Sequence, residues 1–236
     1  MIDIHCHILP AIDDGSPDME TTMRMLDIAV RDGIGHIVAT PHFRYGLEPS
    51  PQDILEALRI VQDEAVRQGS PVRLYGGADI RLTYELLEAL GKADLPTINK
   101  SRYFLLELPD LIPPHLDEFI FEAKIKGYIP IITHPERNYS LLSAFEKADT
   151  LRESGALFQL TAMSITGDFG RHIRKFSLHL LKKGYVDFVA SDAHGTDRRI
   201  PLLSRAYREV ADVLSVHEAQ KMFTDNPGAV LENREF

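Results

Sequence analysis

The feature that most constrains the fold is a repeated alternation of short apolar runs with longer segments of helical spacing. Strand–helix alternation along the whole chain indicates parallel strands joined by right-handed crossovers. Seven apolar runs predict strands, each about 4–8 residues long and most of them rich in Ile, Val, Leu, Phe and Tyr. They are Met1–His7, Gly35–Thr40, Val72–Gly77, Tyr103–Leu108, Ile129–Thr133, Leu157–Thr161 and Val186–Ser191. A chain of 236 residues suits one domain, 1–236.

Three Pro-containing signals predict where helices begin. Ser16-Pro17 predicts an N-cap followed by Pro in the first turn, for a helix that ends near Asp32. Ser50-Pro51 repeats this signal, and Pro113-Pro114 opens a third helix. The apolar faces expected for the second and third helices consist of Ile54, Leu55, Leu58, Val61 and Ala65, and of Leu116, Phe119, Ile120 and Ala123.

Metal-ligand residue types recur where the predicted strands end. They are His5 and His7, His42, Asp79, Glu107, His134, and Asp192 and His194. In a (β/α) barrel all of these ends converge on one mouth, whereas in an open sheet only the switch point forms a crevice. The pattern therefore favours a barrel over a doubly wound sheet.

The first strand places two imidazoles together. Because side chains alternate across a strand, His5 and His7 share one face, and Ile2, Ile4, Cys6 and Ile8 share the other. The two histidines either bind one ion together or are hydrogen-bonded polar residues. Cys6 is expected to be a small core residue, since no Arg follows closely to complete a cysteine-based phosphatase loop.

Each strand-end residue alone also has a simpler explanation. His42, His134 or His194 could be a hydrogen-bonded loop residue, Asp79 could cap a helix from Ile80 to about Leu90, and Asp192 could lie in a turn. Taken together, neutral imidazoles with carboxylates suit Zn, Mn or Fe, and the set is longer than one ion needs. Two or three ions are expected. Asp14 is either a further ligand or part of a turn, and the remaining histidines (His36, His115, His172, His179 and His217) are expected to be structural or exposed.

Composition narrows the possible partners and location. A formal net charge of −9 argues against broad binding to nucleic acid or anionic lipid. No apolar run is long enough to span a bilayer, the N-terminus lacks the pattern of a secretory signal, and the single cysteine fits a reducing cytoplasm. The clearest basic cluster (Arg171, His172, Arg174, Lys175, Lys182 and Lys183) is expected to be a solvated helix face.

The ordered motifs resemble those of the PHP (polymerase and histidinol phosphatase) superfamily over essentially the full length. Within it, the chain is similar to the manganese-dependent protein-tyrosine phosphatases of capsule and exopolysaccharide operons, the CpsB/CapC type. The motifs are Asp3-Ile4-His5-Cys6-His7-Ile8-Leu9-Pro10, Asp13-Asp14-Gly15, Thr40-Pro41-His42, Gly77-Ala78-Asp79-Ile80, Glu107-Leu108-Pro109, His134-Pro135-Glu136-Arg137, Gln159-Leu160-Thr161-Ala162-Met163-Ser164, Gly167-Asp168-Phe169-Gly170 and Ser191-Asp192-Ala193-His194. The resemblance implies an α/β fold, a distorted (β/α)7 barrel of the PHP type, which is TIM-like.

The resemblance also implies a site of two or three Mn²⁺ ions. One ion would take His5, His7 and Asp192; a second would take Glu107 and His134, with Asp79 bridging; a third would take Asp14, His42 and His194. Arg137 and Arg199 would contact the substrate phosphate, with Arg198 as the alternative to Arg199. Asp79 departs from the family, which usually has Glu there.

The implied activity is phosphomonoester hydrolysis by attack of metal-bound hydroxide, with His42 or His194 assisting the leaving group. The implied substrate is phosphotyrosine on a bacterial tyrosine kinase that controls polysaccharide synthesis. Two alternatives stay open: another PHP-type phosphoesterase, either a small-molecule phosphatase or a nuclease, and a non-catalytic metal-stabilised scaffold that binds a kinase.

Overall fold

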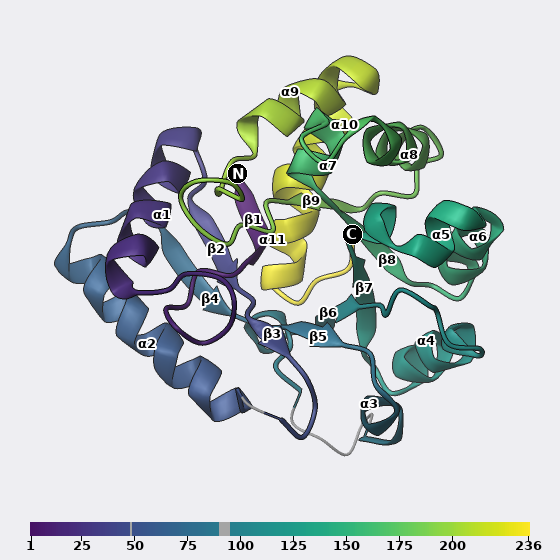
Figure 1. The fold of residues 1–236 in the computed structure, drawn as a ribbon, viewed down its shortest axis with the longest axis horizontal. Coiled ribbons are helices and arrows are strands. Elements are labelled where there is room, and N and C mark those ends of the chain that lie inside the picture. Colours follow the sequence, from purple (N-terminus) through teal and green to yellow (C-terminus); the bar gives the residue numbers. More distant parts are fainter. Residues whose placement is uncertain (48, 90–94) are drawn as a thin grey trace.

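The strands form two parallel sheets in the computed structural model, which describes residues 1–47, 49–89 and 95–236 (Figure 1). The first sheet has the order β1-β2-β4, with β1 Ile2–Cys6, β2 His36–Ala39 and β4 Arg73–Gly76. The second has the order β3-β5-β6-β7-β8-β9, with β3 His42–Phe43, β5 Asp79–Arg81, β6 Tyr103–Glu107, β7 Ile129–Thr133, β8 Leu157–Thr161 and β9 Phe188–Ala190. The prediction of an α/β fold with parallel strands is confirmed.

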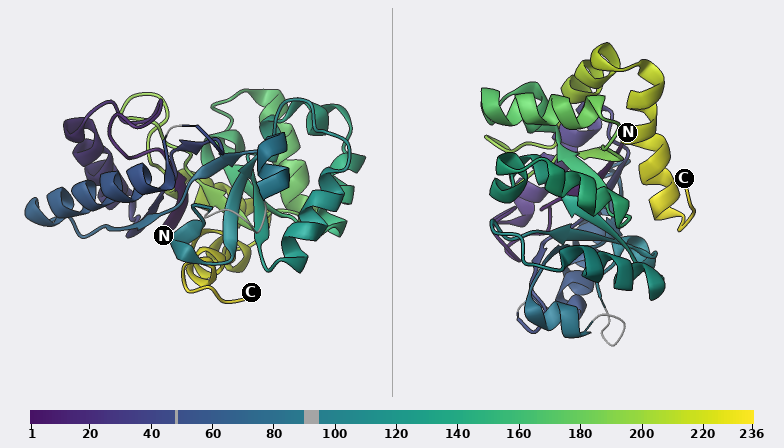
Figure 2. Two further views of the ribbon diagram at one scale, coloured as in Figure 1. Left: turned by 90° about the horizontal axis from the view of Figure 1, so that it is seen from below. Right: turned by 90° about the vertical axis from the view of Figure 1, so that its right-hand side faces the viewer.

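Helices surround the strands in all three views (Figures 1 and 2). The α-helices are α1 Met19–Asp32, α2 Pro51–Arg67, α3 Tyr84–Ala89, α4 Leu116–Ile125, α5 Tyr139–Ser143, α6 Glu146–Glu153, α7 Ala162–Thr166, α8 Arg171–Lys182, α9 Ser204–Val213, α10 Val216–Gln220 and α11 Asn226–Leu231. Short 3₁₀ turns η1 Ile98–Lys100 and η2 Pro135–Arg137 and the π-helical turn η3 Lys221–Asp225 complete the described part. No helix among the described residues is both long and apolar enough to cross a membrane.

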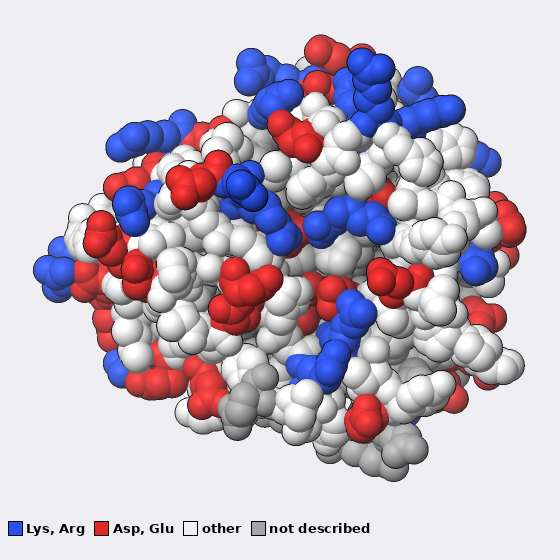
Figure 3. Space-filling model, in the orientation of Figure 1, with Lys and Arg blue, Asp and Glu red and all other residues white. Residues whose placement is uncertain are grey.

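The end of β1 lies beside the segment that follows β9. The amide of His7 donates to the carbonyl of Ala193 at 2.8 Å, and the amide of Asp192 donates to the carbonyl of His5 at 2.8 Å. The first and last strands therefore bring their carboxyl ends to the same place. In the orientation of Figure 1, the surface is hollowed near the middle of this face, with acidic and basic side chains around the hollow (Figure 3).

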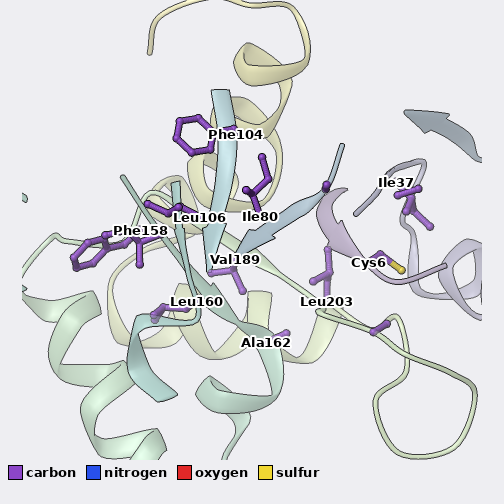
Figure 4. Close-up of a cluster of buried hydrophobic side chains, with 14 of the residues drawn as sticks. Cys6, Ile37, Ile80, Phe104, Leu106, Phe158, Leu160, Ala162, Val189 and Leu203 are labelled. Carbon is purple, nitrogen blue, oxygen red and sulfur yellow. The ribbon is translucent and has the colours of Figure 1, made fainter. Parts of the chain in front are cut away.

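The period of two along each strand separates the core into two buried clusters. Leu105, Ile131 and Phe188 belong to one cluster, and alternate residues such as Leu106 and Val189 belong to the other. The cluster that contains Leu106 and Val189 fills the space between strands and helices (Figure 4). Two residues further along β6 and β7, the face of Leu105 and Ile131 ends in the polar side chains of Glu107 and Thr133, which places a polar site above an apolar floor.

One expectation for β1 is wrong. Ile2 and Ile4 lie in one buried cluster and Cys6 and Ile8 in the other, rather than on one shared face. The pairing of β1 with β2 shifts register between Asp3 and Cys6. Such an irregularity breaks the alternation of side chains, and sequence spacing does not reveal it.

The third predicted strand, Val72–Gly77, is followed by a further strand and not directly by a helix. Asp79 opens β5 and pairs with Leu105 of β6, so the helix expected from Ile80 is wrong; α3 begins at Tyr84. The helix end expected near Leu90 lies outside the described residues. Similarly, β3 follows β2 after a short break and was not predicted. Pairing with a neighbouring strand decides these short segments, and local sequence does not encode it.

The helix starts were predicted with mixed success. Ser50 caps α2 and forms a reciprocal capping box with Asp53, as expected. Ser16 does not cap α1; Asp18 does, accepting from the amide of Thr21 at 2.7 Å. Ser16 is fully buried, and its hydroxyl donates to the carbonyl of Asp18 instead.

Candidate metal centre

At the carboxyl ends of the strands, four of the predicted ligands (His42, Glu107, His134 and Asp192) line one cavity of about 230 Å³. The cavity lining comes from strands and from the segments that follow them, and consists of His42, Arg81, Glu107, Leu108, Asp110, Thr133, His134, Arg137, Asn138, Asp192 and Arg199. The ligand-type side chains within the described residues form three groups whose donor atoms lie within 4.8 Å of one another. These groups are His5, His7 and Asp192; His7, Asp14, His42 and His194; and His42, Asp79 and Glu107.

The first group has the spacing of ligands on a single ion. The Nε2 atoms of His5 and His7 are 3.1 Å apart, and Oδ1 of Asp192 lies 3.5 Å and 3.6 Å from them. Bond lengths of about 2.0–2.2 Å in tetrahedral or octahedral geometry place neighbouring ligand atoms roughly 3.0–3.5 Å apart. The three atoms therefore fit around one cation.

The second group lies at the outer side of the first. Oδ1 of Asp14 lies 3.5 Å from Nε2 of both His42 and His194. The Nε2 atom of His194 is buried and has no hydrogen-bond partner within the described ranges. A buried nitrogen lone pair without a donor is a suitable position for a cation.

Asp79 lies at the centre of the constellation. Its Oδ2 is 3.6 Å from Nε2 of His5, 3.7 Å from Nδ1 of His42 and 3.8 Å from Nε2 of His134. This oxygen is buried and has no hydrogen-bond partner in the part of the chain that the structure describes, while Oδ1 accepts from the hydroxyl of Thr133 at 3.1 Å. A carboxylate oxygen surrounded by imidazoles from three strands fits a bridging ligand between ions, despite the missing methylene relative to Glu.

Glu107 and His134 both lie near Asp79. The carboxylate of Glu107 groups with His42 and Asp79, and it also pairs with Nη1 of Arg81 at 2.9 Å. His134 belongs to none of the three groups found among the described residues, although its Nε2 lies 3.8 Å from Oδ2 of Asp79, so the expected set of Glu107 and His134 around one ion is not among them. Sequence reasoning did not single out Arg81. Its position at the end of β5, two residues after a predicted ligand, is the signal that could have found it.

Electrostatics favour the forms of these residues that bind metal. Burial opposes ionisation of Asp192, but the neighbouring His5 and Arg137 hold its pKa well below the usual range. Burial also opposes ionisation of Asp79, but the neighbouring His5 and His134 outweigh it and lower the pKa of this carboxyl group. Burial lowers the pKa of His194 to about 3. At neutral pH the carboxylates are charged and this imidazole is neutral, as ligation requires.

Residues behind the ligands fix the imidazole rings. Oδ2 of Asp13 lies 2.7 Å from Nδ1 of His7, and Oε1 of Gln159 lies 2.8 Å from Nδ1 of His5. In each ring Nδ1 can donate to its oxygen partner, which directs Nε2 into the centre. Sequence reasoning named Asp14 in this loop and assigned Asp13 no role. The rule that a ligating histidine uses its second nitrogen on a carboxylate is the signal that points to it.

Two arginines, one from the turn after β7 and one from the loop after β9, converge on Asp192. Arg137 donates to Oδ2 of Asp192, and Nη2 of Arg199 lies 2.5 Å from the same oxygen. Both line the cavity, whereas Arg198 is exposed and is not among the lining residues. The loop is closed by hydrogen bonds from the amides of His194 and Gly195 to the carbonyl of Arg199 at 2.8 Å and 3.1 Å.

Two of the candidate ligands have strained backbone conformations. His134 has φ 36° and Asp192 has φ 53°, both in the left-handed region that non-glycine residues rarely adopt. Such conformations cost about 1–3 kcal/mol each and persist where surrounding contacts hold them. Gly15 is also constrained, because a Cβ there would lie 2.2 Å from the carbonyl oxygen of His7.

The other singled-out residues lie away from the centre. Cys6 is fully buried, and burial raises the pKa of its thiol, as expected of a core residue rather than a nucleophile. His36 contacts Tyr75 at 2.9 Å, and His115 contacts Glu118 at 2.9 Å. None of the five histidines expected to be structural or exposed belongs to the three ligand groups found among the described residues.

Comparison with known proteins gives relatives along the full chain. The chain is 39% identical to tyrosine-protein phosphatase YwqE of Bacillus subtilis over 201 residues, covering 84% of this chain and 79% of the relative. It is 30% identical to tyrosine-protein phosphatase CpsB of Streptococcus pneumoniae over 238 residues, covering 98% of each.

Comparison with solved structures agrees with the comparison of sequences. One from a study of YwqE of Bacillus subtilis and CpsB of Streptococcus pneumoniae, described as unique metal-dependent tyrosine phosphatases, superposes with a TM-score of 0.95 at 34% identity, covering 100% of this chain and 96% of that one. A histidinol phosphate phosphatase of Lactococcus lactis shares the fold, with a TM-score of 0.52 at 12% identity over 94% of each chain.

The family model for capsular polysaccharide synthesis proteins, CpsB/CapC, matches residues 1–232. The resemblance inferred from the motifs is thereby confirmed. The chain belongs to the CpsB/CapC family.

Proposed function

We propose that this chain is a metal-dependent phosphatase that removes phosphate from phosphotyrosine in proteins. The observation that carries the proposal is Oδ2 of Asp79, a buried carboxylate oxygen within 3.8 Å of imidazole nitrogens of His5, His42 and His134. Relatives that bear the name tyrosine-protein phosphatase support the substrate class.

The residues proposed to hold metal are His5, His7, Asp14, His42, Asp79, Glu107, His134, Asp192 and His194. We propose that the site holds two or three Mn²⁺ ions. Histidine and carboxylate ligands without a thiolate suit Mn, and also Fe or Zn. Bound ions would lower the pKa of a coordinated water and so supply a nucleophile at neutral pH. All other steps depend on this chain's own side chains.

Arg137 and Arg199 are proposed to bind the phosphate. Their guanidinium groups line the cavity on the side of Asp192, and planar N–H donors suit phosphate oxygens. Pairing with one carboxylate holds both groups in place before substrate enters. This arrangement orients the phosphate toward the ligand groups.

The two candidate acids differ. His194 is neutral at neutral pH, because burial lowers its pKa to about 3, so it is better suited to binding metal than to donating a proton. The side chain of His42 is 41% exposed and lines the cavity. Of the two, His42 is the better placed to assist a departing tyrosinate.

The proposed domain organisation, barrel, location and substrate are those expected of the family. We propose that residues 1–236 form one domain and that the two sheets together make a distorted seven-stranded barrel, each split strand counted once. The hydrogen bonds between β1 and the segment after β9 support this closure. We further propose a cytoplasmic enzyme whose substrate is a bacterial tyrosine kinase of polysaccharide synthesis.

The test is a substrate comparison with Mn²⁺ supplied. We expect hydrolysis of phosphotyrosine peptides, and little hydrolysis of matched phosphoserine peptides or of histidinol phosphate. Turnover of histidinol phosphate without turnover of phosphotyrosine would overturn the substrate class and keep the phosphatase. Absence of any turnover, with kinase binding retained, would favour the scaffold alternative.

A further inference from the structure

Helix α8 carries a concentration of positive charge that the proposed chemistry does not use. No Asp or Glu occurs between Asp168 and Asp187, although the whole chain has a formal net charge of −9. The groove along this helix, here called the α8 basic surface, has a volume of about 440 Å³ and is lined by Arg171, Arg174, Lys175, Leu178, His179 and Lys182. Figure 3 shows Lys and Arg side chains gathered along the upper right edge of this face, over α9 and α8.

Most of these charges are not used to hold the fold together. Arg174 is the exception, since it donates to Glu209 at 2.7 Å and to the carbonyl of Ile165 at 3.0 Å. Arg171, Lys175 and Lys182 are exposed and form no ion pair with any residue that the structure describes. A positive side chain in the first turn also opposes the helix dipole, so helix stability does not explain Arg171.

The α8 basic surface begins at the rim of the candidate metal centre. The guanidinium carbon of Arg137 lies 5.3 Å from the centre of the Phe169 ring, and Phe169 precedes Arg171 by two residues. Helix α8 packs against η2, the turn that carries Arg137. Its 12 residues extend about 18 Å, the length of roughly five or six residues of extended peptide.

We propose that the α8 basic surface docks an acidic segment of the protein substrate, next to the phosphotyrosine in sequence. This inference rests on the proposed phosphatase function and adds the kind of substrate that the enzyme prefers. Exposed charges of one sign beside a site attract a segment of opposite sign and hold it in register. The lining offers no Phe, Tyr or Trp on which nucleic acid bases would stack, which favours a peptide.

Lys175 and Lys182 are the residues to change, because neither touches the metal centre nor pairs with a carboxylate within the described ranges. The test variant is Lys175→Gln with Lys182→Gln. The matched control, Arg31→Gln with Arg73→Gln, removes the same charge from exposed residues at the end of α1 and the start of β4. The Mn²⁺-supplied enzyme is assayed on free phosphotyrosine and on two phosphotyrosine peptides, one flanked by Asp and Glu and the other by Asn and Gln.

For the test variant we expect a roughly fivefold higher KM on the acidic peptide at low salt, with kcat unchanged, because two exposed ion pairs are lost. KM values for the neutral peptide and free phosphotyrosine should not change, the control should match the wild type, and salt near 0.5 M should abolish the difference. An unchanged KM on the acidic peptide, or equal changes on both peptides, would overturn the proposal.

A binding measurement separates this inference from the proposed function. Fluorescence anisotropy of a labelled acidic peptide with Phe in place of phosphotyrosine should show weaker binding to the test variant than to the control. If the wild type fails to hydrolyse free phosphotyrosine, the proposed function is wrong, and the anisotropy still decides docking. Loss of binding to single-stranded DNA or to phosphatidylserine vesicles, with peptide binding unchanged, would assign the surface to another partner.

Discussion

Asp13 offers a direct test of how the structure holds its candidate metal ligands. Its carboxylate lies 2.7 Å from Nδ1 of His7 and accepts hydrogen bonds from the amides of Gly15 and His42, both at 2.9 Å. Burial raises and these contacts lower the pKa of Asp13, with a net decrease to about 2, so it is ionised at neutral pH. Replacing Asp13 by Asn removes the charge facing the His7 ring; an oxygen in the place of Oδ2 still accepts from His7 and from the amide of His42, while the amide of Gly15 loses its acceptor.

The expected cost can be worked from these contacts. A hydrogen bond to a charged group contributes about 1.5–3 kcal/mol and a neutral one about 0.5–1.5 kcal/mol, so Asp13→Asn should cost about 1.5 kcal/mol at His7. This corresponds to about tenfold in metal affinity, within the roughly 10–100-fold range for residues that orient ligands.

The assay is a titration of phosphatase activity against free Mn²⁺. Asp13→Asn should shift the midpoint about tenfold higher and restore most of the rate at saturating metal. The control is Asp18→Asn, which changes the same groups at the N-cap of α1, where Asn serves equally well. An unchanged midpoint for Asp13→Asn would refute the reasoning.

Three further predictions follow from the same contacts. Arg81→Gln should leave Glu107 without its 2.9 Å partner and weaken Mn²⁺ binding a few-fold, measured by the same titration; tighter binding would contradict a positioning role. Gly15→Ala should lower the free energy of unfolding by about 2 kcal/mol or more, measured in urea, because its Cβ would meet the His7 carbonyl at 2.2 Å; wild-type stability would contradict this. In the metal-free folded protein, the pKa of His194 is lowered from 6.5 to about 3. Between these pH values the unfolded chain binds more protons at this residue than the folded chain. The free energy of unfolding should therefore fall as the pH decreases from 6.5 toward 3. His194→Gln should flatten that dependence in calorimetry.

Which of the candidate ligands lie close together could be predicted in large part from the sequence, because strand periodicity and strand ends are local properties. His5 with His7, and Asp192 with His194, are spaced so that both members of each pair can face one site. Parallel topology then brings separate strand ends together, and the structure does place donor atoms from these residues within 4.8 Å in the described groups.

Other features depend on contacts that no local pattern records. The register shift in β1 separates Ile4 from Cys6, and pairing with β6 makes Asp79 part of a strand rather than a helix cap. Asp13 and Arg81 contact the candidate ligands His7 and Glu107, and these contacts exist only once the chain is folded. Such supporting residues have ordinary sequence surroundings, so they are recognised from distances and burial.

The central claim is that histidines and carboxylates from distant strands share a cluster of cations. Anomalous X-ray diffraction from crystals of the protein purified with Mn²⁺ tests it most directly. We predict at least two anomalous peaks, one enclosed by His5, His7 and Asp192 and another within bonding distance of Asp79. Crystals that diffract well and show no peak at these residues, from protein that hydrolyses phosphotyrosine, would contradict the account.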